Sequence, residues 1–356
     1  MTALPPGSTI GILGGGQLGR MLAVAAAQLG YRCHIFAPDD LSPAAEVSAM
    51  HTRADYDDEA MLAQFAEAVD VVTYEFENVP AATIARLSAA RITRPGIKAL
   101  KVAQDRLEEK QFVAELGGCP APHAPVDSLD DLHAAIGRIG TPAILKARRF
   151  GYDGKGQARL ATPADADAAW DAIGRQPAVL EGFVRFEQEF SVILARGVDG
   201  DIRHWPVAEN RHRDGILARS TVPAMGLAAE QAPGAIAFAE KLAGALDHVG
   251  VLTLEFFATS EGPIFNEMAP RVHNSGHWTI EGAVTSQFEN HIRAVVGLPL
   301  GDTALAAKAA EMTNLIGDEA DDWAALFADP AAHVHLYGKG ASRPGRKMGH
   351  VTKLTL

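Results

Sequence analysis

The sequence predicts a protein of mixed fold class, with an α/β unit at the amino-terminal end and an α+β arrangement in the remainder. Three observations support this prediction. Short apolar strands alternate with helices at first, antiparallel strand signals take over after residue 105, and a strand-rich piece with one short helix near Trp323 ends the chain. The chain has 356 residues, of which 47% are hydrophobic, so two or three domains are expected.

The first unit begins with an apolar strand at 8–13, followed by a glycine-rich turn at 14–19 and an alanine-rich helix. Further strands cover 32–36 and 69–74, and the latter continues into an acidic turn at 75–80. Strands that alternate with helices form parallel sheets. We therefore expect a parallel α/β unit.

The turn at 14–19 has the spacing Gly-x-Gly-x-x-Gly between a strand and a helix, which is typical of phosphate-binding loops. Backbone N–H groups at the start of a helix attract an anion. Asp39 and Asp40 follow about 20 residues later, where an acid that binds ribose is expected. A dinucleotide, a smaller phosphorylated ligand and a purely structural turn all stay open.

The second part begins with a helix that has Asp105 as its N-cap and ends at Gly117 and Gly118. The elements expected after it are a linker at 120–125, strands at 142–148 and 157–160, a helix at 162–174, and strands at 179–184 and 189–194.

The loop between the strands at 142–148 and 157–160 is rich in glycine and cations, and Lys146 precedes it. Because the second strand returns at once, this loop is a hairpin flap and not a Walker-type strand–loop–helix. Such a flap can close over nucleotide phosphates with N–H donors and exclude water. A flexible basic hairpin is the alternative.

Glu255 and Glu267 lie in two apolar runs that flank a turn at 259–262, which predicts an antiparallel hairpin. Their midpoint falls inside the turn, so a symmetric register places the two glutamates opposite each other on one face. Like charges in this position destabilise a hairpin unless a cation lies between them. A divalent cation, with Asn266 as a further oxygen donor, is the economical explanation. Two solvated carboxylates are the alternative.

The polar loop at 270–277 is typical of a functional segment, with Arg271 as the expected anion ligand. His273 and His277 have a spacing that suits zinc on a helix, but Gly276 argues against a helix there. Among the strands, Glu181 and Glu189 could bind an amino-purine edge and a ribose diol.

Near the end of the chain, Arg343, Arg346 and Lys347 form a cationic group on an acidic protein. This group predicts a phosphate site, with a solvated tail as the alternative.

The net charge of −12 disfavours nucleic acid and anionic membranes as partners. No export signal or long uncharged apolar run is found, which predicts a cytoplasmic protein with no membrane span. Cys33 and Cys119 have no metal-ligand spacing, so we expect both to be small core residues.

Taken in order, these motifs resemble the ATP-grasp superfamily and, within it, the N5-carboxyaminoimidazole ribonucleotide synthetases of purine biosynthesis. The resemblance runs from Gly11 to about Lys353. The segments that carry it are 14–20, 74–79, 151–157, 266–278 and 343–347.

The resemblance implies an ATP-grasp fold with a Rossmann-like pre-ATP-grasp domain at 1–104 and an ATP-grasp domain at 105–300, whose lid covers about 120–184. A small strand-rich domain follows at 301–356. It implies a homodimeric ligase that uses ATP, Mg²⁺ and bicarbonate to carboxylate 5-aminoimidazole ribonucleotide through carboxyphosphate, giving ADP and phosphate. The alternatives are a formate-using or biotin-carboxylase-like ligase, an NAD-dependent dehydrogenase and a non-catalytic nucleotide sensor.

The resemblance also implies roles for individual residues, and Phe150 is a departure because the family commonly carries glycine there. The implied ATP contacts are Arg106, Lys146, Gly151, Tyr152, Asp153, Gly154, Lys155, Gly156, Gln157, Glu181, Gly182, Phe183, Val184, Glu189, His212, Asn266 and Glu267. The implied metal ligands are Glu255 and Glu267. The implied substrate contacts are Gln17, Leu18, Glu75, Tyr152, Arg271, Arg343 and Lys347. The implied catalytic residues are Asp153, Arg271 and His273.

Overall fold

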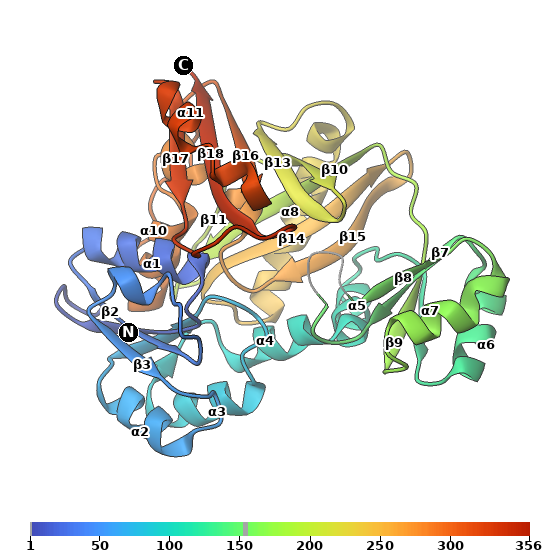
Figure 1. The fold of residues 1–356 in the computed structure, drawn as a ribbon, viewed down its shortest axis with the longest axis horizontal. Coiled ribbons are helices and arrows are strands. Elements are labelled where there is room, and N and C mark those ends of the chain that lie inside the picture. Colours follow the sequence, from blue (N-terminus) through green and yellow to red (C-terminus); the bar gives the residue numbers. More distant parts are fainter. Residues whose placement is uncertain (1, 152–155) are drawn as a thin grey trace.

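The computed structural model describes residues 2–151 and 156–356, which form three sheets with their covering helices (Figure 1). One sheet is parallel and belongs to the first hundred residues, and the other two are antiparallel. The predicted α/β and α+β fold class is therefore confirmed.

The amino-terminal part is a five-stranded parallel sheet with helices on both faces. Its elements are β1 (Thr9–Leu13), α1 (Gln17–Gln28), β2 (Arg32–Ala37), η1 (Ala45–Val47), β3 (Met50–Arg53), α2 (Glu59–Glu67), β4 (Val71–Tyr74), α3 (Ala81–Ala90), β5 (Ile92–Thr93) and α4 (Ile97–Gln104). The strand order is β3-β2-β1-β4-β5. Ile10 and Ile12 pack on the α1 side, whereas Leu13 packs with residues of α2 and α3. Burial on both faces explains why β1 and β4 are almost wholly apolar.

The second part is a four-stranded antiparallel sheet that projects to one side of the molecule (Figure 1). Its elements, together with the helix that leads to it, are α5 (Arg106–Glu115), β6 (His123–Val126), α6 (Leu129–Ile139), β7 (Ala143–Ala147), β8 (Gln157–Leu160), η2 (Pro163–Asp165), α7 (Ala166–Ala172) and β9 (Ala178–Gly182). Leu132 of α6 and Trp170 of α7 pack on the sheet in one apolar cluster. β7 and β8 are paired directly, as the predicted hairpin flap requires.

The linker predicted at 120–125 is wrong for its second half. β6 begins at His123 and pairs with β9, with Pro125 opposite Val179. The strand order β6-β9-β7-β8 places β6 at an edge of the sheet. Proline is tolerated in an edge strand because its missing N–H would face away from the sheet.

The third part is a nine-stranded sheet, ordered β15-β14-β10-β12-β13-β16-β18-β17, with one further strand beside β10. Its elements are β10 (Gln188–Arg196), β11 (Ile202–His204), β12 (Ala208–Arg213), β13 (Ile216–Val222), α8 (Gly226–Ala245), β14 (Gly250–Thr259), β15 (Gly262–Ala269), η3 (Asn274–Gly276), α9 (Thr279–Gly282), α10 (Gln287–Val296), β16 (Ala309–Ile316), η4 (Gly317–Ala320), α11 (Trp323–Ala328), β17 (Ala332–Leu336) and β18 (Lys347–Thr355).

Alternate residues of β10 pack on opposite faces of this sheet. Val192 and Leu194 join the apolar cluster that contains α8, and Ile193 joins the cluster that contains α10. The strand-rich carboxyl-terminal piece continues the same sheet, since β16 pairs with β13. The short helix expected near Trp323 is α11.

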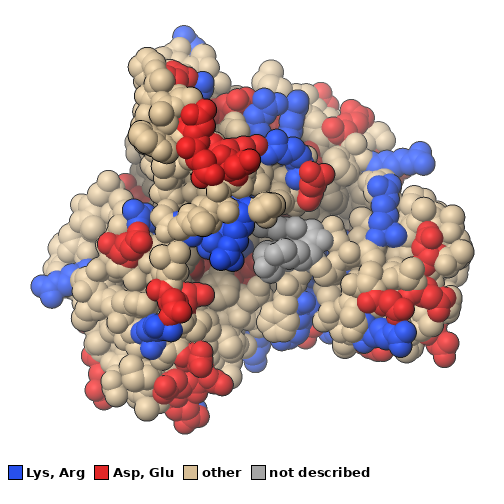
Figure 2. All heavy atoms as spheres, in the orientation of Figure 1, with Lys and Arg blue, Asp and Glu red and all other residues tan. Residues whose placement is uncertain are grey.

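Acidic and basic side chains are interspersed over the face of the molecule drawn in Figure 2. Within the described ranges, no helix is both long and apolar enough to cross a bilayer. Cys33 is buried in the core as predicted, but Cys119 is exposed, so the prediction that both are core residues is wrong for the second. Cys119 follows two glycines at the end of α5, where the chain runs along the surface.

Candidate active site

A cavity of about 450 Å³ lies where the three sheets meet. Its walls come from the start of α1, the segment after β4, the end of α4 and the start of α5, the loop after β7, the hairpin β14–β15 with the loop that follows it, and the start of β18. The carboxyl ends of parallel strands are a common place for ligands. The lining residues are Gln17, Leu18, Glu75, Phe76, Glu77, Asn78, Ala103, Gln104, Arg106, Glu109, Arg148, Phe150, Gly151, Glu255, Glu267, Met268, Ala269, Arg271, His273, Asn274 and Lys347.

The predicted pairing of Glu255 with Glu267 is confirmed, because the two residues are register partners of β14 and β15. The reason is not simple symmetry. Thr259 pairs with Gly262, so the turn is centred between residues 260 and 261, and Phe256 pairs with Phe265. A bulge then adds Asn266 to one strand and shifts the register by one residue. The irregularity brings the two carboxylates opposite each other.

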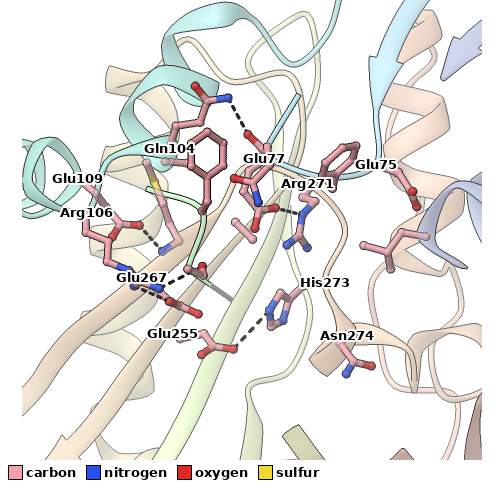
Figure 3. A pocket seen from close by; sticks show the side chains of 18 of the residues that line it. Glu75, Glu77, Gln104, Arg106, Glu109, Glu255, Glu267, Arg271, His273 and Asn274 are labelled. Atoms are coloured by element: carbon pink, nitrogen blue, oxygen red, sulfur yellow. Dashed lines mark hydrogen bonds and ion pairs between the residues drawn. The ribbon is translucent and has the colours of Figure 1, made fainter. Parts of the chain in front are cut away.

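The two glutamates of this pair have different electrostatic surroundings (Figure 3). Burial raises the pKa of Glu255, and the nearby Glu267 charge raises it further. Burial also acts to raise the pKa of Glu267, but the charges of Arg106 and Lys146 outweigh it and lower that pKa. Arg106 Nη1 lies 3.1 Å from Glu267 Oε2, and His273 Nε2 lies 3.4 Å from Glu255 Oε1. Glu267 therefore keeps its negative charge to lower pH than Glu255 does.

A second group of charges lies deeper, between α5 and the lid sheet. Lys146 Nζ donates to Glu181 Oε2 at 2.9 Å, and Lys110 Nζ lies 3.2 Å from Glu181 Oε1. Lys110 also donates to the backbone oxygen of Asn266 at 3.1 Å, so the bulge residue is hydrogen bonded to this group of charges. Glu181 is thus a counter-charge for two lysines, and both of its oxygens face cations.

Glu189 and His212 face each other across β10 and β12, and their side chains are hydrogen bonded. Burial acts to lower the pKa of His212, but the Glu189 carboxylate raises it above the ordinary value. The pair lies on the strands next to the glutamate hairpin, because β10 also pairs with β14. This brings together two residues that the resemblance assigned to the nucleotide.

The glycine-rich turn after β1 holds a carboxylate of the protein itself. The backbone N–H groups of Gly16 and Gly19 both donate to Glu75, the second at 2.6 Å. Burial raises the pKa of Glu75, and the two amide donors act in the opposite direction. Gln17 and Leu18, between these glycines, line the cavity. The backbone amides of this turn therefore hold the side chain of Glu75, whereas the motif predicts a phosphate there.

Arg271 is held by Glu77, which accepts a hydrogen bond from Arg271 Nε (Figure 3). Burial acts to lower the pKa of Arg271, but the Glu77 charge raises it. The loop that carries Glu77 is fixed in turn, because Gln104 Nε2 donates to the backbone oxygens of Glu77 and Val79 at 2.8 and 2.7 Å. Arg271 thus presents a fixed positive charge to the cavity.

Glu77, Asn274 and Glu109 are among the lining residues that were not predicted as site residues. Glu77 and Asn274 lie inside segments that carry the resemblance, but their roles depend on partners far along the chain. The buried side-chain oxygen and nitrogen of Asn274 have no hydrogen-bond partner within the described residues. Glu109 accepts from the backbone N–H of Met268 at 2.7 Å, and burial raises its pKa to about 8. The sequence of α5 does not indicate that Glu109 is buried, because a charged residue in an amphipathic helix is expected on the side that faces solvent.

The flap begins beside Arg106, whose Nη2 donates to the backbone oxygen of Gly151 at 3.3 Å. Phe150 has a φ of 62° and is 69% exposed. This left-handed backbone conformation favours glycine, which is the residue that the family commonly carries at this position. Gly156 has a φ of 70° and its oxygen accepts from Ala147. The predicted contacts Tyr152, Asp153, Gly154 and Lys155 lie outside the described residues.

Other predicted residues lie around the cavity or away from it. Lys347 lines it, whereas Arg343 is exposed and is not among the lining residues. Gln157 is the first residue of β8. The segment after Glu181 is held by the lid, since Gly182 and Phe183 donate to the oxygens of Pro122 and Pro142. Val184 follows it, half-buried. The ligand roles of these residues stay predictions.

Three family models match the chain in the order of its three parts. They are the ribonucleotide synthetase preATP-grasp domain over residues 7–104, the ATP-grasp domain over 111–288, and the phosphoribosylaminoimidazole carboxylase C-terminal domain over 310–355. The second model alone spans half of the chain.

Similarity to whole proteins is high. The N5-carboxyaminoimidazole ribonucleotide synthase of Brucella melitensis is 52% identical, over 99% of this chain and 98% of that protein. The N5-carboxyaminoimidazole synthetase of Staphylococcus aureus, complexed with ADP, superposes with a TM-score of 0.95 at 37% identity, covering 100% of this chain and 95% of that one. The synthase of Aspergillus clavatus, in complex with ADP and 5-aminoimidazole ribonucleotide, gives 0.91 at 30% identity, with 98% and 94% covered.

Proposed function

The chain belongs to the N5-carboxyaminoimidazole ribonucleotide synthases, and we propose that its cavity between the three sheets is the site of their reaction. The protein is an ATP-dependent carbon–nitrogen ligase that joins bicarbonate to the amine of 5-aminoimidazole ribonucleotide and releases ADP and phosphate. One observation carries the assignment to this cavity. Glu255 and Glu267 lie opposite each other at its wall, surrounded by cations that suit a triphosphate.

The carboxylate pair fits Mg²⁺. Mg²⁺ takes oxygen ligands and is often held by one or two carboxylates together with substrate phosphates. Glu255 and Glu267 offer such oxygens on one face of the hairpin, and their mutual repulsion gives a cation a reason to bind between them. When bound, Mg²⁺ would offset charge on the phosphate oxygens during transfer. Glu255 and Glu267 are the residues that would hold it.

The first chemical step transfers the γ-phosphoryl group of ATP to an oxygen of bicarbonate, giving carboxyphosphate and ADP. Arg106 and Lys146 supply fixed positive charge for the phosphates, because Glu267 and Glu181 hold their side chains in place. Preorganised charges of this kind stabilise a transition state without reorganising. The flap that begins at Gly151 would cover the phosphates and exclude water, which would otherwise hydrolyse carboxyphosphate.

In the second step the amine nitrogen of the substrate bonds to the activated carbon, directly or as released CO₂. The carbon–oxygen bond to phosphate breaks, and the nitrogen loses a proton. Arg271 and His273 flank the bicarbonate-derived group in this proposal, and Arg271 would stabilise its negative charge. Burial lowers the pKa of His273 to about 3, with the Arg271 and Lys347 charges acting in the same direction. His273 is therefore neutral and acts as a hydrogen-bonding group.

We place the substrate between α1 and β18. Gln17, Leu18 and Lys347 line that end of the cavity and would bind the ribonucleotide phosphate, together with Arg343, which is exposed and outside the cavity lining. The unpartnered amide of Asn274 is a further group for the substrate. Beside it, Glu75 would face the imidazole together with Tyr152 and Asp153.

The nucleotide base lies toward the lid in this proposal. The segment from Glu181 to Val184 would form the adenine hinge, and Glu189 would bind the ribose with His212 beside it. Glu181 acts there mainly through its lysines, because both of its oxygens are already engaged. The further ATP contacts proposed are Gly151, Gly154, Lys155, Gly156, Gln157 and Asn266.

The experiment that tests this function is ADP formation by the purified protein with ATP and Mg²⁺, with each substrate omitted in turn. We expect rapid ADP release only when bicarbonate and 5-aminoimidazole ribonucleotide are both present. Formate in place of bicarbonate would support a transformylase, and biotin as acceptor would support a biotin carboxylase. Protection by NAD against thermal unfolding would support a dehydrogenase. ADP release that ignores both bicarbonate and the ribonucleotide would contradict the proposal.

We further propose that the protein acts as a cytoplasmic homodimer, with domains at 1–104, 105–300 and 301–356. The family resemblance favours the dimer, and two free cysteines agree with a reducing compartment. Sedimentation equilibrium with a mass near twice the 37.7 kDa of the chain is the expected result. A species of the single-chain mass at working concentrations would contradict the dimer.

A further inference from the structure

A chain of buried hydrogen bonds runs from the middle of the large sheet to His273. Ser220 donates to Asn210 Oδ1 at 2.8 Å, and Asn210 Nδ2 donates to Ser191 Oγ at 3.1 Å. Ser191 donates to Ser275 Oγ at 2.8 Å, and Ser275 Oγ lies 2.8 Å from His273 Nδ1. The first four residues are at most 3% exposed. We refer to these four residues as the polar relay.

The donor and the acceptor of each hydrogen bond in the polar relay follow from the contacts between Ser275 and His273 Nδ1. The backbone N–H of Ser275 donates to His273 Nδ1 at 3.3 Å, and a backbone N–H can only donate. Nδ1 is therefore an acceptor, and the hydroxyl of Ser275 must donate to it as well. Ser275 Oγ then accepts from Ser191, which in turn accepts from the amide nitrogen of Asn210. A neutral imidazole with Nδ1 as an acceptor carries its proton on Nε2.

His273 Nε2 is the nitrogen that faces the hairpin, 3.4 Å from Glu255 Oε1 (Figure 3). The backbone of His273 is fixed separately, because Gln287 Oε1 accepts from its N–H at 2.9 Å and Gln287 Nε2 donates to its oxygen at 2.7 Å. The polar relay therefore acts only on the imidazole ring of His273 and not on its backbone. Ser191 is also the register partner of Glu255 on the neighbouring strand, so the polar relay lies beside the carboxylate that the ring addresses.

Three polar residues of the polar relay occupy central strands of the large sheet. Ser191 belongs to β10, and Asn210 pairs with Ser220 between β12 and β13. Apolar residues at these buried positions would pack without any need for partners, and a buried polar group without a partner is costly. In the polar relay each residue is the hydrogen-bond partner of the next, and the series of hydrogen bonds ends at the imidazole ring of His273. A purely structural role for the chain would not require it to reach that ring.

We propose that the polar relay fixes His273 as the Nε2–H tautomer and so makes it a hydrogen-bond donor that orients Glu255, with Ser191, Asn210, Ser220 and Ser275 as positioning residues. The inference rests on the proposed function, in which Glu255 is a metal ligand. Carboxylates that bind metals are commonly oriented by such outer hydrogen bonds, whose loss costs roughly 10- to 100-fold in metal affinity or activity. The polar relay gives His273 a defined role, that of a donor and not a base.

The decisive measurement is the ¹⁵N spectrum of the protein labelled at its 13 histidines, with the His273 signals assigned by their absence in His273→Asn. We expect Nδ1 to resonate as an unprotonated ring nitrogen and Nε2 as a protonated one, in the absence of any ligand. Ser275→Ala removes the strongest bond to Nδ1, so we expect a mixture of tautomers. The same variant should lose about tenfold in kcat, with the KM for the ribonucleotide nearly unchanged.

Ser191→Ala interrupts the polar relay one bond further away and should show the same two effects at smaller size. Thr352→Val is the matched control, because it removes a buried hydroxyl that has no partner within the described residues and lies on β18, four places from β10 in the order of the large sheet. Protonated Nδ1 in the unsubstituted protein would overturn the proposal, whether or not the variants fold. An equal loss of kcat in Thr352→Val would also overturn it. If the unsubstituted protein forms no ADP, the proposed function fails while the tautomer result still stands.

Discussion

Glu181→Gln tests the counter-charge that holds Lys146 and Lys110 between α5 and the lid sheet. The side chains of these three residues are at most 11% exposed, and the two nitrogen–oxygen distances are 2.9 and 3.2 Å. At an effective dielectric constant of about 20, each contact contributes roughly 5 kcal/mol of Coulomb attraction before desolvation. Breaking a buried pair while leaving its partner costs about 3–5 kcal/mol. The substitution keeps the shape and removes the charge, so the loss falls on the two lysines.

Two results follow from this loss. Burial lowers the pKa of Lys146 and the Glu181 charge opposes that effect, so Glu181→Gln lowers the pKa further and weakens the charge that meets ATP. The KM for ATP should rise. Amide hydrogen exchange in β7 and β9 should become roughly 10²–10⁴-fold faster, which is the rate equivalent of that free-energy loss. Glu187→Gln, at an exposed position six residues away, is the control and should leave exchange and KM within error. Unchanged exchange and unchanged KM in Glu181→Gln would refute the role of Glu181 as counter-charge.

Three further predictions concern the site and the core. Glu267→Gln should reduce ATP turnover by about 10²-fold or more while the protein stays folded, and near-normal ADP release at ordinary Mg²⁺ would contradict the metal role. Burial lowers the pKa of His248 to about 4 and of His291 to about 3. Since both values lie below 6.5, the unfolded chain binds more protons in that window, and the free energy of unfolding should fall by up to about 1.4 kcal/mol per pH unit per histidine as pH decreases from 6.5. Urea unfolding at pH 7 and pH 5 measures this slope, which should weaken when both are replaced by glutamine. Burial raises the pKa of Cys33 to about 12, so a thiol reagent should label one cysteine rapidly, at exposed Cys119, and a second rapid label would contradict the structure.

The sequence predicts the local elements of this fold well because their signals lie within short windows. The parallel unit, the N-cap at Asp105, the hairpin flap and the glutamate hairpin are all visible in local patterns. The local pattern gives a wrong prediction for the segment at 120–125, where a linker was expected. Three prolines in this segment hide an edge strand, and only its partner β9 shows that it is paired.

The pairing of Glu255 with Glu267 shows how a correct prediction can rest on an incomplete reason. Symmetry about the turn predicts the pair, but the turn is centred half a residue earlier, and the bulge at Asn266 restores the alignment. A bulge of this kind has no reliable sequence signal when the inserted residue is not glycine. The backbone oxygen of Asn266 then becomes available to Lys110.

The residues that sequence reasoning missed depend on contacts between distant segments. Glu77 is defined by Arg271, which lies 194 residues away, and Glu109 by the backbone of Met268. The amides of the glycine-rich turn, predicted to meet a phosphate, hold the side chain of Glu75, which follows β4. Residue types and spacing indicate the chemistry of such groups, whereas their partners come from the packing of the three sheets.

The most direct test of the metal assignment is a crystal structure with ADP and Mn²⁺ in place of Mg²⁺. Anomalous scattering then locates the ion independently of the protein. We expect the peak between the carboxylates of β14 and β15, within about 2.0–2.2 Å of oxygens from both Glu255 and Glu267 and in contact with a phosphate. An ion bound elsewhere, with the two side chains turned apart, would contradict the account of the site.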